Sequence, residues 1–363
     1  MSRVRVVGLL VLGLLAAPGG ARASPEPPAQ PREGPGGAAY PHADVRKAVY
    51  GEGPLSYWLY EPANPIPASA PLMVFNHGWG GTNPKAYGAW IRHLVRRGNI
   101  VVYPIYQEAA TMRFPTAQIT PNAIRAVKDA IARLQSGGHV QPELNHVAIV
   151  GHSAGGMITA NMAALAASVG LPPPQAIMCV EPGKSWNPPR RQSVPLEEMR
   201  RIPPATRVLA VVGDHDRIAQ DVDAKRIIRE TTQVPRANKR FVVVASDEHG
   251  RPGLIADHFS PLAGDVSYDA GATQSRAKGT RLGGFLRRRF EAKIYGPQSQ
   301  EGDLSRTLNA LDYYGYWTLF DRLCDAAFAG RSVAQAFEMT NERFMGRWSD
   351  GTPVKELVLT DSP

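Results

Sequence analysis

The chain has 363 residues, enough for one large domain or two, and its 43% of hydrophobic residues excludes a wholly disordered protein. Its formal net charge is +9, which falls to +6 if Arg3, Arg5 and Arg22 are removed with a leader. The remaining basic residues are scattered and lack interleaved aromatic side chains, which argues against a nucleic-acid partner.

The first 23 residues predict a secretory signal peptide. Arg3 and Arg5 form a basic start, residues 6–17 are apolar, and residues 21–23 read Ala-Arg-Ala, as small residues flank a cleavage site. The apolar run is shorter than the roughly 20 residues that a membrane-spanning helix needs. We therefore expect cleavage near Ala23 and an exported protein, secreted or periplasmic, with no stable membrane insertion.

Three further segments are predicted from composition and pattern. Residues 24–44 are dominated by Pro, Gly and Ala and can bury little surface, which predicts a flexible lead-in. Residues 45–295 alternate between strand and helix patterns and form the predicted catalytic domain. Residues 296–363 are rich in helix-forming patterns and predict a helical C-terminal extension packed on that domain, interrupted near Gly315 and ending in a small strand or loop.

The order of elements from residue 45 predicts the fold class. A hairpin of two strands opens the domain, and further β-rich runs follow at residues 70–76, 99–106, 146–151, 176–182, 206–213 and 239–246. Helical periodicity appears at residues 85–98 and again from Thr120-Pro121, where a proline stands in the first turn. This alternation predicts an α/β protein with a mostly parallel central sheet and helices on both faces.

The two cysteines leave two alternatives open. Export permits a disulfide between Cys179 and Cys324. Cys179 lies in an apolar strand-like run, so a buried, inert thiol is equally consistent with the sequence. Two cysteines are too few for a disulfide-rich scaffold in either case.

In a parallel sheet, ligands bind at the carboxyl ends of the strands, and the predicted strand ends carry reactive side chains. The sequence Gly151-His152-Ser153-Ala154-Gly155 follows an apolar strand and precedes a helix. A serine at such a sharp turn sits in a crowded backbone, so small residues are needed beside it, and its hydroxyl is exposed at the positive end of the helix. This pattern makes Ser153 the candidate nucleophile.

These residues resemble the α/β-hydrolase superfamily, and within it the secreted esterases and lipases related to dienelactone hydrolases, acetylhydrolases and polyester hydrolases. The resemblance covers residues 45–262 and is specific in the serine turn and in the chain order Ser, Asp, His. It implies an α/β-hydrolase fold and matches Ser153 to the nucleophile. It also implies an oxyanion hole made by the backbone N–H groups of Ala154 and Trp79, the latter within Asn76-His77-Gly78-Trp79-Gly80-Gly81.

For the acid, the resemblance selects Asp216, three residues after Gly213 at the end of a strand. Asp214 is the competing residue in the same turn, and either aspartate could instead form the turn or cap a helix. Glu181 follows a different strand, where some relatives keep their acid, and is a minor competitor.

For the base, two histidines remain open. His249 lies just past the strand ending at Ser246, where relatives place the histidine, and we favour it because it is close to the strand end. His258 is the alternative base and would require the loop between them to fold back over the site. Whichever of the two histidines is not the base is expected to stabilise the loop. His77, His152 and His215 flank motifs and are poorer candidates.

Together these residues predict a secreted serine hydrolase that cleaves carboxylic esters through a Ser-Asp-His triad and an acyl-enzyme. The expected substrate is a small-molecule ester, a lipid or a polyester, and no cofactor or metal is expected. Trp186 could form a wall of the substrate site, although a loop tryptophan is more often only packed. The alternatives are a peptidase or amidase on the same triad, or a binding protein that has kept the fold.

Overall fold

The computed structural model describes residues 23–107, 116–185, 193–270, 308–337 and 342–363. Within them, nine strands form one sheet in the order β1-β2-β4-β3-β5-β6-β7-β8-β9. The strands are β1 Asp44–Tyr50, β2 Tyr57–Ala63, β3 Ser69–Asn76, β4 Ile100–Pro104, β5 Gln141–His152, β6 Ala176–Val180, β7 Arg207–Gly213, β8 Lys239–Val244 and β9 Val358–Thr360.

The sheet is parallel in its centre and antiparallel at both ends. β1 pairs with β2 as the predicted hairpin, and β2 runs antiparallel to β4. From β4 through β3, β5, β6 and β7 to β8 every pairing is parallel, and β9 then adds antiparallel to β8. The carboxyl ends of the parallel strands therefore meet at one edge, as the strand pattern predicted.

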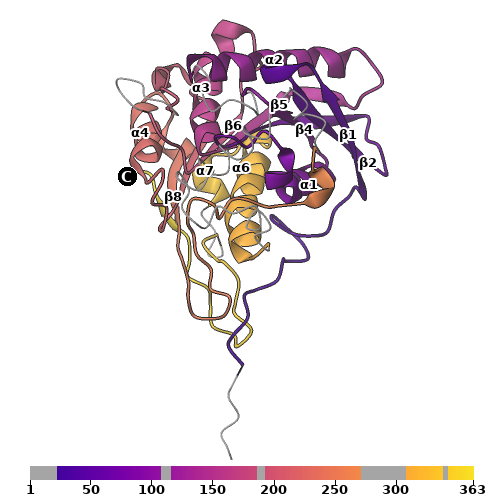
Figure 1. The fold of residues 1–363 in the computed structure, drawn as a ribbon. Helices are drawn as coiled ribbons and strands as arrows, with labels where there is room; N and C mark the ends of the chain where they lie inside the picture. Colours follow the sequence, from indigo (N-terminus) through magenta and orange to yellow (C-terminus); the bar gives the residue numbers. More distant parts are fainter. Residues whose placement is uncertain (1–22, 108–115, 186–192, 271–307, 338–341) are drawn as a thin grey trace, which may run out of the picture.

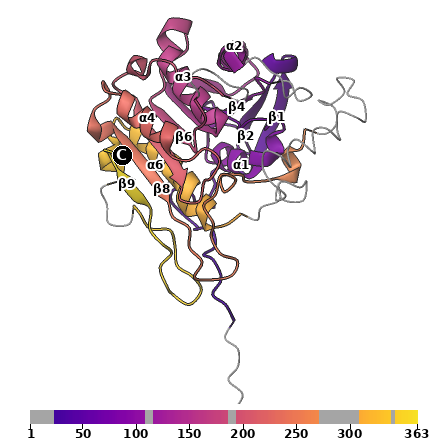
Figure 2. The ribbon, with the colours of Figure 1, turned by 60° about the vertical axis from the view of Figure 1, so that its left-hand side comes forward.

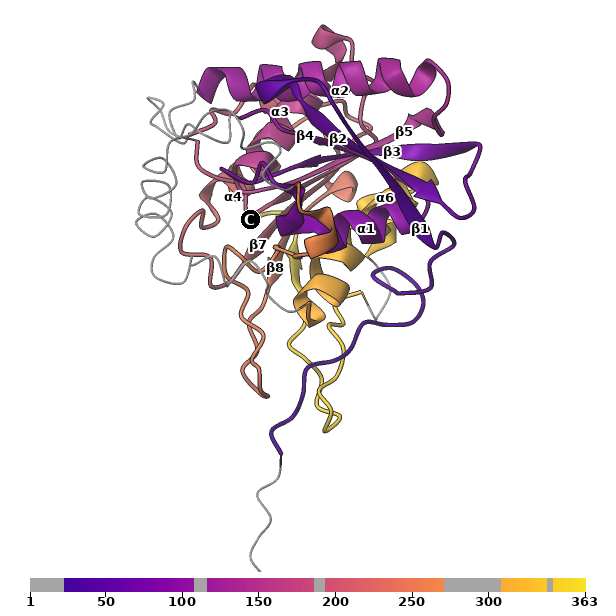
Figure 3. The same cartoon turned by 45° about the vertical axis from the view of Figure 1, so that its right-hand side comes forward.

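Helices cover both faces of the sheet. They are α1 Gly88–Arg96, α2 Ile119–Gln135, α3 Ala154–Val169, α4 Val222–Glu230, α6 Thr318–Phe328 and α7 Val333–Ala336. The apolar side chains of α2, α3 and α4 pack on one face, and those of α1, α6 and α7 pack on the other. Figure 1 and Figure 3 show this sandwich, with α2 above the sheet and α1 and α6 below it in Figure 3. The predicted fold class is confirmed.

The C-terminal residues belong to the same core as the domain before them. A π-helical segment, Leu311–Trp317, runs directly into α6, so Gly315 does not interrupt the helix as predicted but lies in its widened turn. Gly315 is buried, and a Cβ added there would meet, among the described residues, side-chain carbons of Met345 at 3.4 Å and of Val244 at 3.8 Å. Crowding at this position therefore does not force the helix to break. β9 extends the sheet beside β8, as Figure 2 shows.

The predicted flexible lead-in is instead packed against the C-terminal part of the chain. Glu26 and Ser349 exchange hydrogen bonds through Glu26 N and O, and Pro25 O accepts from Arg251 N at 2.9 Å. Further along, Gly36 N donates to the buried carboxylate of Asp321 at 2.8 Å. The composition of residues 24–44 indicated only that they form no core of their own; backbone partners supplied by distant residues hold them in place.

The cysteine alternatives are also resolved. Cys179 and Cys324 are both free and buried, and burial raises the pKa of Cys179 to about 12, so the inert-thiol alternative holds and the disulfide does not. The predicted signal peptide lies almost wholly in residues 1–22, outside the described residues, as does the boundary at residues 295 and 296. No helix in the described part of the chain has both the length and the apolar character needed to cross a membrane.

Candidate active site

Ser153 lies in a strained turn between β5 and α3. Its φ of 56° and ψ of −121° are rare for a residue with a side chain, and α3 begins at the next residue, Ala154. A Cβ on Gly151 would lie 2.2 Å from Gly155 O, and a Cβ on Gly155 would lie 2.1 Å from Asn76 O. Both glycines are therefore required by the close approach of backbone, as the sequence predicted.

Ser153, His258 and Asp216 form a continuous hydrogen-bonded row. Ser153 Oγ lies 3.0 Å from His258 Nε2, and His258 Nδ1 lies 2.9 Å from Asp216 Oδ2. An ionised carboxylate can only accept, so Nδ1 carries the ring proton and Nε2 accepts from the serine hydroxyl. Three segments that are far apart in the sequence thus supply a hydroxyl, an imidazole and a carboxylate in mutual contact.

Comparisons with known proteins agree with this fold. Residues 73–248 match a family model described as the α/β hydrolase fold. The chain thus has the α/β-hydrolase fold. A stretch of 151 residues is 30% identical to Esterase LipI of Mycobacterium tuberculosis, covering 39% of this chain and 43% of that protein. The chain thus spans less than half the length of the curated relative it matches.

Backbone donors hold the carboxylate of Asp216 in place. Asp216 Oδ1 accepts from Ile218 N at 2.7 Å and from Ala219 N at 2.9 Å. Burial alone would raise the pKa of Asp216, but the hydrogen bonds from His258 and from these two N–H groups outweigh it and lower the pKa. Asp214 instead accepts from Ser246 N and Oγ, so it shapes the turn and does not contact the ring.

The structure places His258 beside Ser153, and not His249. His249 is exposed, its Nε2 lies 2.8 Å from Asp350 Oδ2, and its ring lies 5.7 Å from that of Trp348. Closeness to the strand end misled the sequence argument, because the residues just after β8 run away from Ser153.

The segment 247–258, which we name the base loop, reverses direction to bring His258 back. Asp247 and Leu254 exchange two backbone hydrogen bonds of 2.7 and 2.8 Å, so the chain between them is a closed turn. Asp247 Oδ2 also accepts from Trp348 Nε1 and from Lys355 N. The base loop is thus fixed by the C-terminal segment, beside which it extends in Figure 1 and Figure 2.

The loop that carries Trp79 lies against Ser153. A Cβ added to Gly78 would be only 3.4 Å from Ser153 Cβ. Gly78 N donates to the hydroxyl of Tyr87 at 3.0 Å, and Gly80 N donates to Gln107 Oε1 at 2.9 Å. The two flanking N–H groups are held by side chains, which fixes the peptide of Trp79 between them.

Tyr87 and His152 form a link that the sequence argument did not detect. His152 Nε2 lies 2.8 Å from the carbonyl oxygen of His258, and because a carbonyl only accepts, Nδ1 accepts from Tyr87 OH at 2.8 Å. Burial lowers the pKa of His152 to about 4, so the ring is neutral. His152, next to Ser153 in the sequence, thus ties the loop of Gly78 to the backbone of His258. Tyr87 resembled a core residue of a helix, and no spacing signalled this second role.

The only candidate metal cluster in the described part of the chain overlaps this network. Ligand atoms of His152, Glu181 and His258 lie within 4.8 Å of one another. Both histidines already use their two nitrogens in the hydrogen bonds above. A metal ion would have to displace the contacts of Ser153 or Asp216, so these residues fit a metal poorly.

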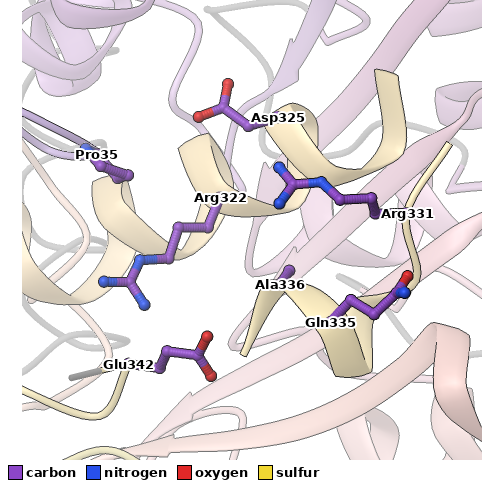
Figure 4. Close-up of a pocket in the computed structure, with 7 residues that line it drawn as sticks. All are labelled: Pro35, Arg322, Asp325, Arg331, Gln335, Ala336 and Glu342. Atoms are coloured by element: carbon purple, nitrogen blue, oxygen red, sulfur yellow. The ribbon is translucent and has the colours of Figure 1, made fainter. Parts of the chain in front are cut away.

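The substrate side of the site is only partly described. Trp186 lies outside the described residues. A separate cavity of about 240 Å³ is lined by residues from the N-terminal segment, α6, α7 and the C-terminal segment, among them Arg322, Arg331 and Glu342 (Figure 4). None of the residues that line it belongs to the row of Ser153, His258 and Asp216.

Proposed function

We propose that this protein is a serine hydrolase that cleaves carboxylic esters, with Ser153 as nucleophile, His258 as general base and Asp216 as the acid that orients the base. The observation that carries the proposal is the row of contacts at 3.0 and 2.9 Å through the two nitrogens of His258. The left-handed backbone of Ser153, held between two obligatory glycines, supports it, because such strain is typical of functional sites.

The geometry supports a two-step reaction. Ser153 Oγ attacks the ester carbonyl carbon while its proton passes to His258 Nε2, and Asp216 stabilises the charged imidazolium through Nδ1–H. The proton then moves from Nε2 to the departing alcohol, which leaves an acyl group on Ser153. Water, deprotonated by the same nitrogen, attacks the acyl carbon and frees the acid and the serine.

The oxyanion of each tetrahedral intermediate is assigned to the backbone N–H groups of Ala154 and Trp79. Ala154 is the first residue of α3, so its N–H points from the positive end of a helix dipole. Trp79 lies on the loop fixed by Tyr87 and Gln107 beside Ser153. Preorganised donors of this kind act on the transition state without reorganising during the reaction.

The choice of an ester over an amide rests on the named relative, which is an esterase. A peptidase or amidase on the same residues is the alternative function, since the hydrogen-bonded row serves either bond. A panel of nitrophenyl esters of increasing acyl length, compared with the matching anilides, separates the two and defines the acyl group. Faster turnover of the anilides would reverse the assignment.

The activated serine has its own test. Ser153→Ala is expected to abolish labelling by a fluorophosphonate probe and to reduce ester turnover by ~10⁴-fold or more, with unchanged thermal unfolding. Ser168→Ala, at an exposed position in the last turn of α3, is the matched control and should label like the wild type. Labelling that persists on another serine would contradict the proposal, and no labelling of the wild type would favour the non-catalytic binding protein.

We further propose that the protein acts after export, on the basis of its N-terminal sequence. Expressed with its full sequence in a host that secretes proteins, it should be recovered outside the cytoplasm with Ser24 as its first residue. N-terminal sequencing of that fraction checks the proposal, and an intact N-terminus on a membrane-bound product would contradict it.

A further inference from the structure

Glu181 is a buried carboxyl group beneath the candidate triad that the proposed reaction does not use. It follows β6, between the strand that carries Ser153 and the strand that leads to Asp216. It has no exposed surface, and its φ of 46° is in the left-handed region that side chains rarely adopt. Its N–H nevertheless donates to Val211 O at 2.7 Å, so the strained backbone is held in place.

The side chain of Glu181 faces the ring of His258. Oε2 lies 3.6 Å from His258 Nδ1, the same nitrogen that contacts Asp216 at 2.9 Å, and 3.4 Å from His152 Nε2. Oε1 accepts from the hydroxyl of Tyr316 at 3.3 Å, whereas Oε2 makes no hydrogen bond with any described residue. One ring nitrogen is therefore approached by two carboxyl groups, of which only one makes a hydrogen bond with it.

The two carboxyl groups differ in protonation. Burial, followed by the charge of Asp216, raises the pKa of Glu181 well above its usual range, whereas the pKa of Asp216 is lowered. Two neighbouring carboxylates in one buried site avoid ionising together. Glu181 is thus neutral while Asp216 carries the charge. The groups that face Glu181 are His258 and Asp257 on the base loop, His152, Asp216 and Tyr316.

We propose that Glu181 is a second acid for His258, a positioning residue that ionises and accepts the Nδ1–H when the carboxylate of Asp216 is removed by substitution. Loss of the Asp216 charge removes one of the causes that keep Glu181 protonated, and its proton passes to water. Loss of the Asp216 side chain also leaves the Nδ1–H without its acceptor, and Glu181 Oε2 lies only 3.6 Å from that nitrogen. The proposal rests on the proposed serine-hydrolase function.

The test compares labelling rates with a fluorophosphonate probe as a function of pH. In Asp216→Ala the labelling rate is expected to fall only about 10²-fold. In the double variant that also carries Glu181→Gln, the rate should fall about 10⁴-fold, the usual loss when a triad has no acid. Glu181→Gln alone, which keeps Asp216, should lose less than about tenfold. The rate of Asp216→Ala should rise with pH through one ionisation that the double variant lacks. A purely structural role for Glu181 would not produce that ionisation.

The matched control is Asp216→Ala combined with Glu143→Gln, the same chemical change at the opposite end of β5, which should label like Asp216→Ala alone. Equal rates and equal pH profiles for Asp216→Ala and the double variant would overturn the inference and leave the proposed function intact. No labelling of the wild type would overturn the proposed function itself. If Asp216→Ala does not fold, Asp216→Asn, of nearly the same volume, takes its place in both arms.

Discussion

The turn of residues 151–155 around Ser153, which we name the elbow, and the base loop place neighbouring side chains by different means. The elbow is held by residues within five positions of one another, together with the adjoining strand β3. The base loop is held by residues about 100 positions away, since Asp247 accepts hydrogen bonds from Trp348 and Lys355. The elbow therefore has a local sequence signature, and the base loop has none.

This difference explains why the sequence argument favoured His249, which the structure places away from Ser153. A local pattern can be predicted from the sequence alone because residues nearby in the chain crowd each glycine and exclude a side chain there. The conformation of the base loop depends on the Trp348 side chain and the Lys355 N–H, both within the last 20 residues. The loop's own sequence therefore does not predict it. His258 occupies its position because Asp247 is anchored, and the distance along the chain from β8 has no bearing on it.

The largest effect should separate the two histidines. His258→Ala removes the contact with Ser153 Oγ and is expected to reduce ester turnover by ~10⁴-fold, about 5.5 kcal/mol in activation free energy. His249→Ala removes only an exposed contact with Asp350 and should stay within a few-fold of the wild type. Steady-state kinetics on a nitrophenyl ester checks both. A reversed order would mean that the base loop rearranges in solution.

Two glycine substitutions test whether the elbow is more crowded than the base loop. Gly155→Ala places a methyl group 2.1 Å from the backbone oxygen of Asn76, which cannot move without disrupting β3, so we expect a loss of unfolding free energy of roughly 3 kcal/mol or more. Gly253→Ala in the base loop meets nothing closer than 3.6 Å and should be nearly neutral. Denaturant unfolding measures both, and equal losses would show that the elbow is no more crowded than the loop.

The sheet, its helices and the elbow were predictable because hydrophobic periodicity and turn chemistry are local. The resemblance to the α/β-hydrolases pointed to Asp216, although only the structure shows that Asp214 binds Ser246. The hydrogen bonds of Tyr87 and Trp348 were not predictable, because a buried aromatic residue has the same sequence pattern whether or not its polar atom bonds to another residue. The lead-in was predicted to be flexible for the same reason, since its partners include Arg251, Asp321 and Ser349, all far from it in the sequence.

A pair of tryptophans tests the long-range half of the comparison. Trp348 and Trp90 are both fully buried. Trp348 Nε1 donates to the Asp247 carboxylate, whereas Trp90 Nε1 has no hydrogen-bond partner among the residues that the structure describes. Trp348→Phe should therefore lower the free energy of unfolding by about 1.5–3 kcal/mol beyond the loss from changed packing, as expected when a hydrogen bond to a charged group is removed. The extra loss should appear as faster hydrogen exchange at the Leu254 amide. Trp90→Phe should leave that amide protected, and equal exchange in both variants would refute the anchor.

The smallest effect concerns the charge of Asp247 alone. Burial would raise the pKa of this carboxyl, but hydrogen bonds from Lys355 N, His249 N and Trp348 outweigh it and lower the pKa. A group whose pKa is lower in the folded state stabilises that state above its unfolded value, near 3.9, and the stabilisation is lost as the pH falls through the folded value. Protection of the Leu254 amide, corrected for intrinsic exchange, should thus be constant between about pH 7 and pH 5 and fall below about pH 4.

Asp247→Asn separates this ionisation from the general effect of acid. The variant keeps the side-chain volume but has no charge to lose, so its Leu254 protection should be lower at neutral pH and should vary less with pH than that of the wild type. Amides in the buried half of β5, next to the elbow, should show the same pH dependence in both proteins, because no contact of Asp247 reaches them. An unchanged acid-dependent loss at Leu254 in the Asn variant would show that the anchor works through shape and not through charge.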